Sequence, residues 1–523
     1  MKRIPSFVFL VIFLLFTFFI LYRVLNYKNV SLTFSDAAKY ALITKNILLK
    51  GLFSTDFSFW STNLFSVSGI PRLIPYSIIP FFKIFGISDL SVILSSLFYF
   101  LCLLIAVYLL GSKLFGKFSG FLSVLAVATN LNFLDYATSG ASEPLFAFET
   151  VFSFYLVTLR KKWATLLCSI FLIAMYFTRP QSFIFIAGVI LYFLLSRLDV
   201  RKAFKLFFVL ALSGIIVDRF IIYPLSFKLP LTSVIYRGLQ SVLTYSSLNA
   251  VSDSLRGGIS SILTISDIGK KVFYNLYNFY KALPAIANPY LWTMFFLGIF
   301  SWKNNKFQNS YKISIIFTTI AVFLVTALSI PFYRYIHPVI PLVYILSSAI
   351  IVEIVKCLTK GRNVKVISLV LLTLFSIIST LGKYLLDIRF KTKLINKDKS
   401  PLYVVMSYKL KENTSTEDII VTNLDTWGSW YGERKTVWFP LNPKMLTPLE
   451  GQKNPFDAIY LTNYLMDDEN YYMGKEWREI FDNPEKIEDK YISENYILKG
   501  IYKVFPEDNY ERQEGRAVLL VRK

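Results

Sequence analysis

The apolar run FVFLVIFLLFTFFILY, residues 7–22, decides the class of fold. Its length approaches the roughly 20 residues that a helix needs to cross a bilayer. No small-residue cleavage motif follows it, and further apolar runs come later in the chain. We therefore expect an uncleaved first membrane span here, and not a signal peptide.

The composition of the whole chain extends this interpretation. Of 523 residues, 54% are hydrophobic and only 17% are charged, whereas a soluble protein carries about 25% charged residues. Residues 70–86 are apolar but contain three prolines, Pro71, Pro75 and Pro80, so we expect a half-inserted or interfacial segment there. Hydropathy predicts about eleven spans: residues 7–22, 88–110, 118–134, 143–159, 163–178, 181–196, 204–222, 285–301, 312–330, 335–355 and 364–385.

The formal net charge of +22 would favour nucleic-acid binding in a soluble protein. With eleven spans, however, the basic short loops all fall on the side of the N-terminus. These loops are residues 111–117, 160–162, 197–205, 302–312 and 356–365, whereas the charge-poor loops are residues 135–143, 178–182 and 329–338. The pattern predicts a multi-pass protein of the cytoplasmic membrane, with its N-terminus in the cytoplasm, its C-terminus outside and no nucleic-acid partner.

Two loops and a tail then lie outside the cell. The expected organisation is a transmembrane domain over residues 1–385, with outer loops 26–87 and 223–284, and an extracytoplasmic domain over 386–523. The tail contains short β-rich runs at residues 417–424, 435–440, 456–463 and 517–523, which predict a small α/β domain. The fold class is therefore a multi-span α-helical membrane protein with a C-terminal extracytoplasmic α/β domain.

Few residues of the kinds that make disulfides or metal sites are present. The three cysteines all lie in or beside apolar segments, which predicts no disulfide framework. The chain has one histidine and no nucleophile-elbow motif, which disfavours a histidine-rich metal site and a serine–histidine triad.

The first outer loop begins with SLTFSDAAKYALITKNILLKG, residues 31–51. Ser35 suits an N-cap, Asp36 opens the helix and Gly51 suits its end, which predicts an amphipathic helix at the membrane surface. Asp36 has two interpretations: an acid favoured by the helix dipole, or a base for chemistry outside the membrane. The sequence of this loop leaves both open.

Three more residues predicted to lie on the outer side bear on the choice between the two interpretations of Asp36. Glu143 opens a span, Arg179 ends one, and Arg334 lies between two tyrosines. An acid beside guanidinium groups at the level of the lipid headgroups could bind a phosphate and deprotonate a hydroxyl. Glu149 lies two turns inside a predicted span, where a carboxylate is a functional candidate by default.

At this point the chain resembles a family. It is similar to the GT-C class of membrane glycosyltransferases, in the branch of aminoarabinose transferases, protein O-mannosyltransferases and bacterial PMT-2-type transferases. The matching motifs, in chain order, are SDAAKY with NILLKG, SGASEPLFAF, YFTRPQS, YRYIHPVIPLVYIL and the tail segment EDIIVTNLDTWGSWYGERKTVWFP.

The resemblance implies an inverting enzyme that moves a sugar from a polyprenyl-phosphate donor to an acceptor hydroxyl. The acceptor would be a cell-envelope glycan, a lipid or a protein, and membrane lipids would be further partners. It implies that Asp36 is the catalytic base. The residues expected to bind substrate are Tyr40, Glu143, Arg179, Tyr333, Arg334 and His337.

One departure leaves a cofactor open. Many relatives have two adjacent acids in the first loop, whereas Ala37 follows Asp36 here. No cofactor is certain; a divalent cation, Mg²⁺ or Mn²⁺, would be held by Asp36, Asp56 or Glu143. The alternatives to a glycosyltransferase are a polysaccharide polymerase or ligase, and a lipid or glycan transporter or flippase.

Overall fold

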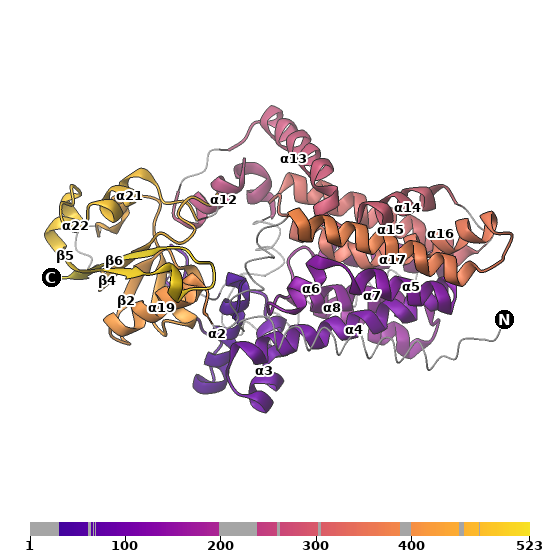
Figure 1. Cartoon of the computed structure of the whole chain (residues 1–523), viewed down its shortest axis with the longest axis horizontal. Coiled ribbons are helices and arrows are strands. Elements are labelled where there is room, and N and C mark those ends of the chain that lie inside the picture. Colours follow the sequence, from indigo (N-terminus) through magenta and orange to yellow (C-terminus); the bar gives the residue numbers. More distant parts are fainter. Residues whose placement is uncertain are drawn as a thin grey trace.

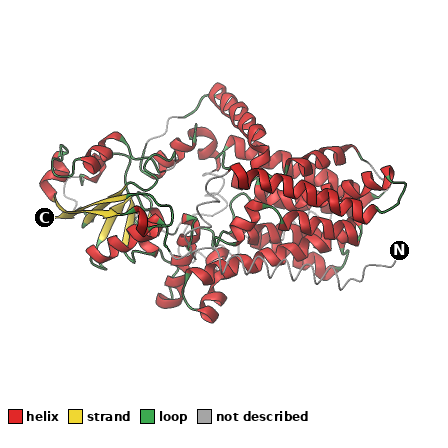
Figure 2. Ribbon diagram, in the orientation of Figure 1, coloured by secondary structure: helices red, strands yellow, loops and turns green. Residues whose placement is uncertain are grey.

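The computed structural model describes residues 31–60, 64–65, 67, 70–197, 238–258, 262–301, 305–386, 399–448, 454–469 and 471–523. The predicted spans at residues 7–22 and 204–222 lie outside these ranges. The described chain has two parts, a bundle of long helices and a smaller domain that contains a sheet (Figure 1). Figure 2 shows that strands occur only in the smaller part, at the end that carries the C-terminus.

Helices form at all nine predicted spans that fall on described residues. Three stretches are long and apolar enough to cross a membrane, or five if each of two bent helix pairs is one span. The chain is therefore a helical membrane protein, and the count of eleven spans stays a prediction. The helices of this part are α4 (Asp89–Phe115), α5 (Lys117–Ala128), α6 (Leu131–Ala137), α7 (Glu143–Thr158), α8 (Lys162–Thr178), α9 (Ser182–Arg197), α14 (Pro289–Phe300), α15 (Lys306–Leu328), α16 (Ile340–Leu358) and α17 (Val364–Leu386).

The proline-broken segment forms α3 (Leu73–Phe85), with Pro80 inside it. Its 13 residues span about 20 Å, less than the roughly 30 Å of a bilayer core. It packs against α4 and against α2 (Ser35–Lys50). A half-inserted or interfacial position remains the prediction for this helix.

The predicted spans at residues 118–134 and 285–301 each contain a break between two helices. The chain bends by 68° between α5 and α6, and by 114° between α13 (Ile265–Ile286) and α14. Asn130 and Asn288 cap the helices that follow the two breaks, and both residues hydrogen-bond to the Tyr344 hydroxyl, at 3.0 and 2.9 Å. Side-chain caps of this kind satisfy backbone groups that a break leaves open inside a membrane.

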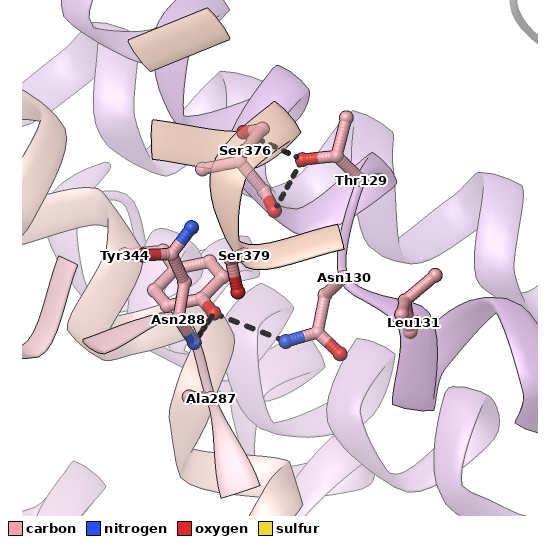
Figure 3. A pocket seen from close by; sticks show the side chains of 9 residues that line it. Thr129, Asn130, Leu131, Ala287, Asn288, Tyr344, Ser376 and Ser379 are labelled. Carbon is pink, nitrogen blue, oxygen red and sulfur yellow. Dashed lines mark hydrogen bonds between the residues drawn. The ribbon is translucent and has the colours of Figure 1, made fainter. Parts of the chain in front are cut away.

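A small polar cavity lies where these two breaks meet (Figure 3). Its volume is about 20 Å³, which suits roughly one water molecule. Thr129 bridges to Ser376 across it at 3.1 Å. The cavity thus joins α5, α14, α16 and α17 through polar contacts inside an otherwise apolar bundle.

The smaller domain is built on a six-stranded sheet in the order β1-β3-β2-β4-β6-β5. The first four strands are parallel, and β6 pairs antiparallel with β4 and with β5. All four predicted β-rich runs contain strands. The strands are β1 (Phe57–Ser58), β2 (Ile419–Thr422), β3 (Lys435–Trp438), β4 (Ala458–Thr462), β5 (Tyr496–Val504) and β6 (Gly515–Arg522).

Strand β1 comes from the first outer loop and not from the tail. Phe57 pairs with Thr436, and Ser58 pairs with Val437. The edge of the sheet is therefore completed by a segment almost 380 positions earlier in the chain. Helices α19 (Leu402–Asn413), α20 (Asp425–Trp430), α21 (Lys475–Asp482) and α22 (Lys490–Asn495) complete the domain.

The middle loop also joins this domain. Arg256 of this loop is completely buried. Its guanidinium donates to the carbonyl oxygens of Phe439, Pro440 and Tyr472 and lies 3.9 Å from the centre of the Phe439 ring. Arg256 therefore anchors helix α12 (Leu248–Leu255) and its loop on the smaller domain.

Candidate active site

Helix α2 carries the first candidate residue. It begins at Ser35, and its N-cap is Phe34, which has no side-chain cap. The prediction that Ser35 caps the helix is therefore wrong, and the Ser35 hydroxyl instead contacts the Tyr471 hydroxyl of the smaller domain at 3.4 Å. The predicted stop is confirmed, because Gly51 ends the helix with a left-handed φ of 66°.

The surroundings of α2 differ from those of a helix lying freely on a membrane surface. It packs against α20 of the smaller domain on one side and against α3 on another. Asn46, which the sequence places on the polar face, is buried and donates to Asp56 and to the Ser54 carbonyl. The helix thus packs between the two parts of the protein, and Asp36 lies in its first turn.

Arg334 connects two acids that are distant in sequence. Its Nη2 atom donates to Asp36 at 2.5 Å, and its Nε atom lies 3.1 Å from Glu143 Oε1. Arg334 lies in the short 3₁₀ helix Tyr333–Tyr335 just before α16. The structure therefore brings together one residue from the first outer loop, one from the start of α7 and one from a late loop.

Arg179 completes the group from the other side. It follows the last residue of α8 and forms an ion pair with Glu143, and it donates to the Ser142 hydroxyl at 3.0 Å. Glu143 Oε2 and Arg179 Nη1 are buried and have no hydrogen-bond partner among the described residues. A buried unpaired polar atom is costly, so these two atoms favour a ligand that accepts and donates hydrogen bonds here.

The four residues Asp36, Glu143, Arg179 and Arg334 are called the arginine–carboxylate cluster below. Its exposure is graded: the side chain of Asp36 is 44% exposed and that of Arg334 is 26% exposed, whereas those of Arg179 and Glu143 are buried. The two positive and two negative charges cancel formally. The cluster is therefore accessible from solvent at Asp36 and Arg334 and buried at Arg179 and Glu143.

The ionisation of Asp36 follows from its neighbours. Burial raises the pKa of this carboxyl, but the Arg334 guanidinium and the Lys39 ammonium outweigh that effect and bring the pKa below its ordinary value. Asp36 is consequently an anion at neutral pH. A carboxylate in that state can accept a proton from a hydroxyl.

The remaining predicted substrate residues divide into two groups. Tyr40 is buried one turn along α2, within electrostatic reach of all four cluster residues. His337 is buried and its Nδ1 atom bonds the hydroxyl of Tyr136. Tyr333, by contrast, is 41% exposed and packs against Phe279 of α13, with ring centres 5.8 Å apart. The structure thus gathers Tyr40 and His337 toward the cluster and turns Tyr333 to a different neighbour.

Two aromatic residues join the cluster without having been predicted as site residues. Tyr136 on α6 lies within electrostatic reach of Glu143 and Arg334, and Tyr335 lies within reach of Arg334 and Asp36. The Phe34 ring faces both Tyr136, at 5.8 Å, and the Arg334 guanidinium, at 5.7 Å. Tyr335 was visible in the sequence as the neighbour of Arg334, whereas nothing local marks Tyr136.

The candidate metal ligands do not form one group. Asp56 binds Lys50 at 3.3 Å, and Lys50 lies about 21 Å along α2 from Asp36 at 1.5 Å per residue. Among the residues that the structure describes, no three histidine, cysteine, aspartate or glutamate side chains are placed to hold a metal ion. Asp36 and Glu143 both face arginines, and a divalent cation between them would be repelled by the guanidiniums. The cluster as placed suits an anion better than a metal ion, and metal dependence stays a prediction to be tested.

Glu149 lies deeper in α7. It is buried, and Thr178 donates to its Oε1 atom at 2.9 Å. Thr178 directly precedes Arg179 at the end of α8. Glu149 therefore contacts the residue next to the cluster rather than the cluster itself.

Part of the chain is similar to a known protein family. Residues 70–223 match the family model of dolichyl-phosphate-mannose-protein mannosyltransferases, and this range includes Glu143 and Arg179. No curated protein sequence matches the chain.

Solved structures match over most of the chain. ArnT from Cupriavidus metallidurans, bound to undecaprenyl phosphate, superposes with a TM-score of 0.58 at 13% identity, over 99% of this chain and 98% of that one. The oligosaccharyltransferase of Archaeoglobus fulgidus in its apo form gives a TM-score of 0.59 at 14% identity, over 92% and 71%. AglB from the same organism, with an inhibitory peptide and a dolichol-phosphate, gives 0.56 at 12% identity, over 89% and 70%.

At these identities the superpositions establish only the fold. The family model adds a sequence similarity that is limited to residues 70–223. Both agree with the motifs that suggested the family in the sequence. Residues 70–223 therefore resemble the dolichyl-phosphate-mannose-protein mannosyltransferase family, and the chain as a whole has the fold of ArnT and of the archaeal oligosaccharyltransferases.

Proposed function

We propose that the protein is an inverting glycosyltransferase that moves a sugar from a polyprenyl-phosphate donor to an acceptor hydroxyl on the outer face of the cytoplasmic membrane. The observation that carries this proposal is the contact of Arg334 with both Asp36 and Glu143 beside Arg179. It joins a partly exposed base to two cations, and glycosyl transfer from a phosphate needs both.

The reaction divides between the two ends of the cluster. Asp36 accepts the proton of the acceptor hydroxyl while that oxygen forms a bond to the anomeric carbon of the sugar. The bond between the anomeric carbon and the phosphate oxygen breaks, and its electron pair leaves with the polyprenyl phosphate. Arg334 and Arg179 stabilise the negative charge on the departing phosphate. A single displacement of this kind inverts the anomeric centre.

Donor binding also adjusts the base. Arg334 lowers the pKa of Asp36 in the structure described here. A phosphate that binds Arg334 neutralises part of this positive charge, so Asp36 becomes a stronger base when the donor is in place. The site would therefore couple phosphate binding to activation of the acceptor.

The relatives support the class of donor. ArnT was solved with undecaprenyl phosphate, and AglB was solved with a dolichol-phosphate and a peptide. Both lipids are polyprenyl phosphates, which is the chemistry that paired arginines at headgroup level recognise. The charge pattern of the short loops supports an extracytoplasmic site, with the smaller domain on the same side.

The test compares cells with and without the protein. Mass spectrometry of the polyprenyl-phosphate sugars and of the envelope glycans is expected to show one donor accumulating and one glycan, lipid or protein lacking the matching sugar. Complementation with the intact chain should restore both, and complementation with Asp36→Asn should restore neither. An unchanged donor pool and unchanged glycans in the deleted strain would refute the proposed function.

A further inference from the structure

The smaller domain holds the segment that leads into Asp36. Trp427 Nε1 donates to the Leu32 carbonyl at 2.9 Å, and the Thr426 hydroxyl donates to the Ser35 carbonyl at 2.6 Å. The hydroxyl oxygens of Tyr471 and Ser35 lie 3.4 Å apart. Since α2 has no side-chain cap of its own, these contacts from another part of the chain fix where the helix begins.

Asp425 accepts hydrogen bonds from two of these three residues, Thr426 and Tyr471. Its Oδ1 atom accepts from the Thr426 backbone N–H at 2.6 Å, and its Oδ2 atom accepts from the Tyr471 hydroxyl at 3.1 Å. Thr426 and Tyr471 also contact Ser35, so Asp425 holds both residues that contact Ser35. This residue is only 6% exposed and is the first residue of α20.

The backbone of Asp425 is unusual. Its φ angle is +53°, in the left-handed region that residues other than glycine seldom adopt. Such a conformation persists only where the surroundings determine it strongly, and it is enriched at functional sites. Both carboxylate oxygens are engaged here, so the side chain and the strained backbone hold each other in place.

The charges around Asp425 connect it to the cluster. The pKa of Asp425 is raised to about 6, chiefly by burial and to a smaller extent by the Asp36 carboxylate, against the lowering effects of the Thr426 and Tyr471 hydrogen bonds and of the Lys39 ammonium of α2. These are the groups that face Asp425 from its own helix, from α2 and from the Tyr471 segment. The Asp36 carboxylate is therefore among the charges that act on Asp425.

From these contacts we propose that Asp425 is a positioning residue for glycosyl transfer: it holds Thr426 and Tyr471 against Ser35 and so fixes Asp36 relative to Arg334. This inference rests on the proposed function for its catalytic consequence. Asp425 itself touches neither donor nor acceptor in this scheme.

The test uses the full chain in proteoliposomes. The donor probe is the polyprenyl-phosphate-sugar fraction extracted from membranes that lack the protein. Asp425→Asn and Tyr471→Phe are expected to lower the maximal rate at least tenfold and to change the half-saturating donor concentration less than twofold. Tyr460→Phe is the matched control, since Tyr460 is a buried tyrosine of the same domain that bonds the Met406 carbonyl instead.

Two further measurements separate positioning from simple loss of structure. In Asp425→Asn the pH dependence of the maximal rate near pH 6 should disappear, because the titrating carboxyl is gone. Asp425→Gly introduces a residue that adopts a positive φ without strain. Its maximal rate should fall as much as that of Asp425→Asn, because both variants lack the carboxylate. Rates within twofold of the wild type in Asp425→Asn and Tyr471→Phe, or a lowered rate with an unchanged pH profile, would overturn the proposal.

Amide hydrogen exchange gives a readout that needs no turnover. Exchange over residues 32–41 should be faster in Tyr471→Phe than in Tyr460→Phe, because the start of α2 loses an external hydrogen bond. Equal exchange in the two variants would refute the positioning of α2. Absence of transfer by the wild-type protein would instead refute the proposed function and leave this comparison valid.

Discussion

Arg334 donates a hydrogen bond to Asp36 although 298 positions separate the two residues in the chain. The contact joins the first turn of α2 to the segment that precedes α16. Both side chains are partly exposed, whereas Glu143 behind them is buried. The contact therefore marks the entrance of the arginine–carboxylate cluster, and the first two predictions concern its two members.

Asp36→Asn should abolish transfer. The amide cannot accept the hydroxyl proton, and loss of a general base typically lowers a rate by 10²–10⁴-fold. Turnover in proteoliposomes is the measurement, with Asp467→Asn as the control because Asp467 is an exposed acid that pairs with Arg478 in the smaller domain. Retention of more than a tenth of the wild-type rate by Asp36→Asn would exclude it as the base.

Arg334→Ala should weaken donor binding more than acceptor binding. The guanidinium is the more exposed of the two cations and would be the first to meet the phosphate. We expect at least a tenfold higher half-saturating donor concentration and less than a threefold change for the acceptor. Arg334→Lys should recover part of the loss, because it restores the charge without the bidentate geometry. Equal effects on donor and acceptor would argue against a phosphate site.

The same variant should change the pH profile. A base works above its own pKa, and Arg334 keeps the pKa of Asp36 below the ordinary aspartate value of about 3.9. Removing the cation raises that pKa, so the acidic fall in kcat/KM should move to higher pH in Arg334→Ala. The measurement is kcat/KM from pH 4 to 8 for both proteins, and a shift to lower pH would contradict the assignment.

Chelation should leave activity largely intact. The carboxylates of the cluster face guanidiniums, which fit an anion better than a divalent cation. Turnover is therefore expected to stay within twofold after treatment with EDTA and removal of the chelator. A loss that Mg²⁺ or Mn²⁺ reverses would restore the metal hypothesis and would require ligands beyond this cluster.

Arg256→Ala should release the middle loop from the smaller domain. The change leaves three carbonyl oxygens without their donor and removes a stacked guanidinium. Faster proteolysis and faster amide exchange over residues 238–258 are expected. Lys270→Ala is the control, because Lys270 is an exposed base of the same loop. Unchanged exchange would show that the loop is held by other contacts.

The sequence predicted those parts of the fold that local pattern determines. Apolar runs located the helices, and β-rich runs located β2, β3, β4 and β6. Strand β5 was missed, since its alternation includes lysines and is interrupted by Gly500 at a register shift. The breaks at Asn130 and Asn288 were missed because they depend on Tyr344 of another helix.

In the candidate site, too, the residues marked by local sequence could be predicted, and those that depend on tertiary contacts could not. Asp36, Glu143, Arg179 and Arg334 could be predicted, since each is a charged residue in or beside a loop that the sequence assigns to the outer side of the membrane. Tyr136 and Asp425 could not, because their relation to the cluster exists only after α6 and the smaller domain pack against α2. Ser35 was assigned a local cap by the ordinary rule for helix starts, whereas Tyr471 supplies its partner from a position 436 residues away.

The pairing of β1 with β3 has a consequence for any attempt to produce the tail alone. A fragment starting near residue 386 would lack Phe57 and Ser58, and so the backbone amides and carbonyls along the outer side of β3 would be bare. Uncovered edges of that kind recruit strands from other molecules. The excised tail should therefore self-associate, and a short peptide spanning residues 52–60 should suppress that association by filling the vacant edge.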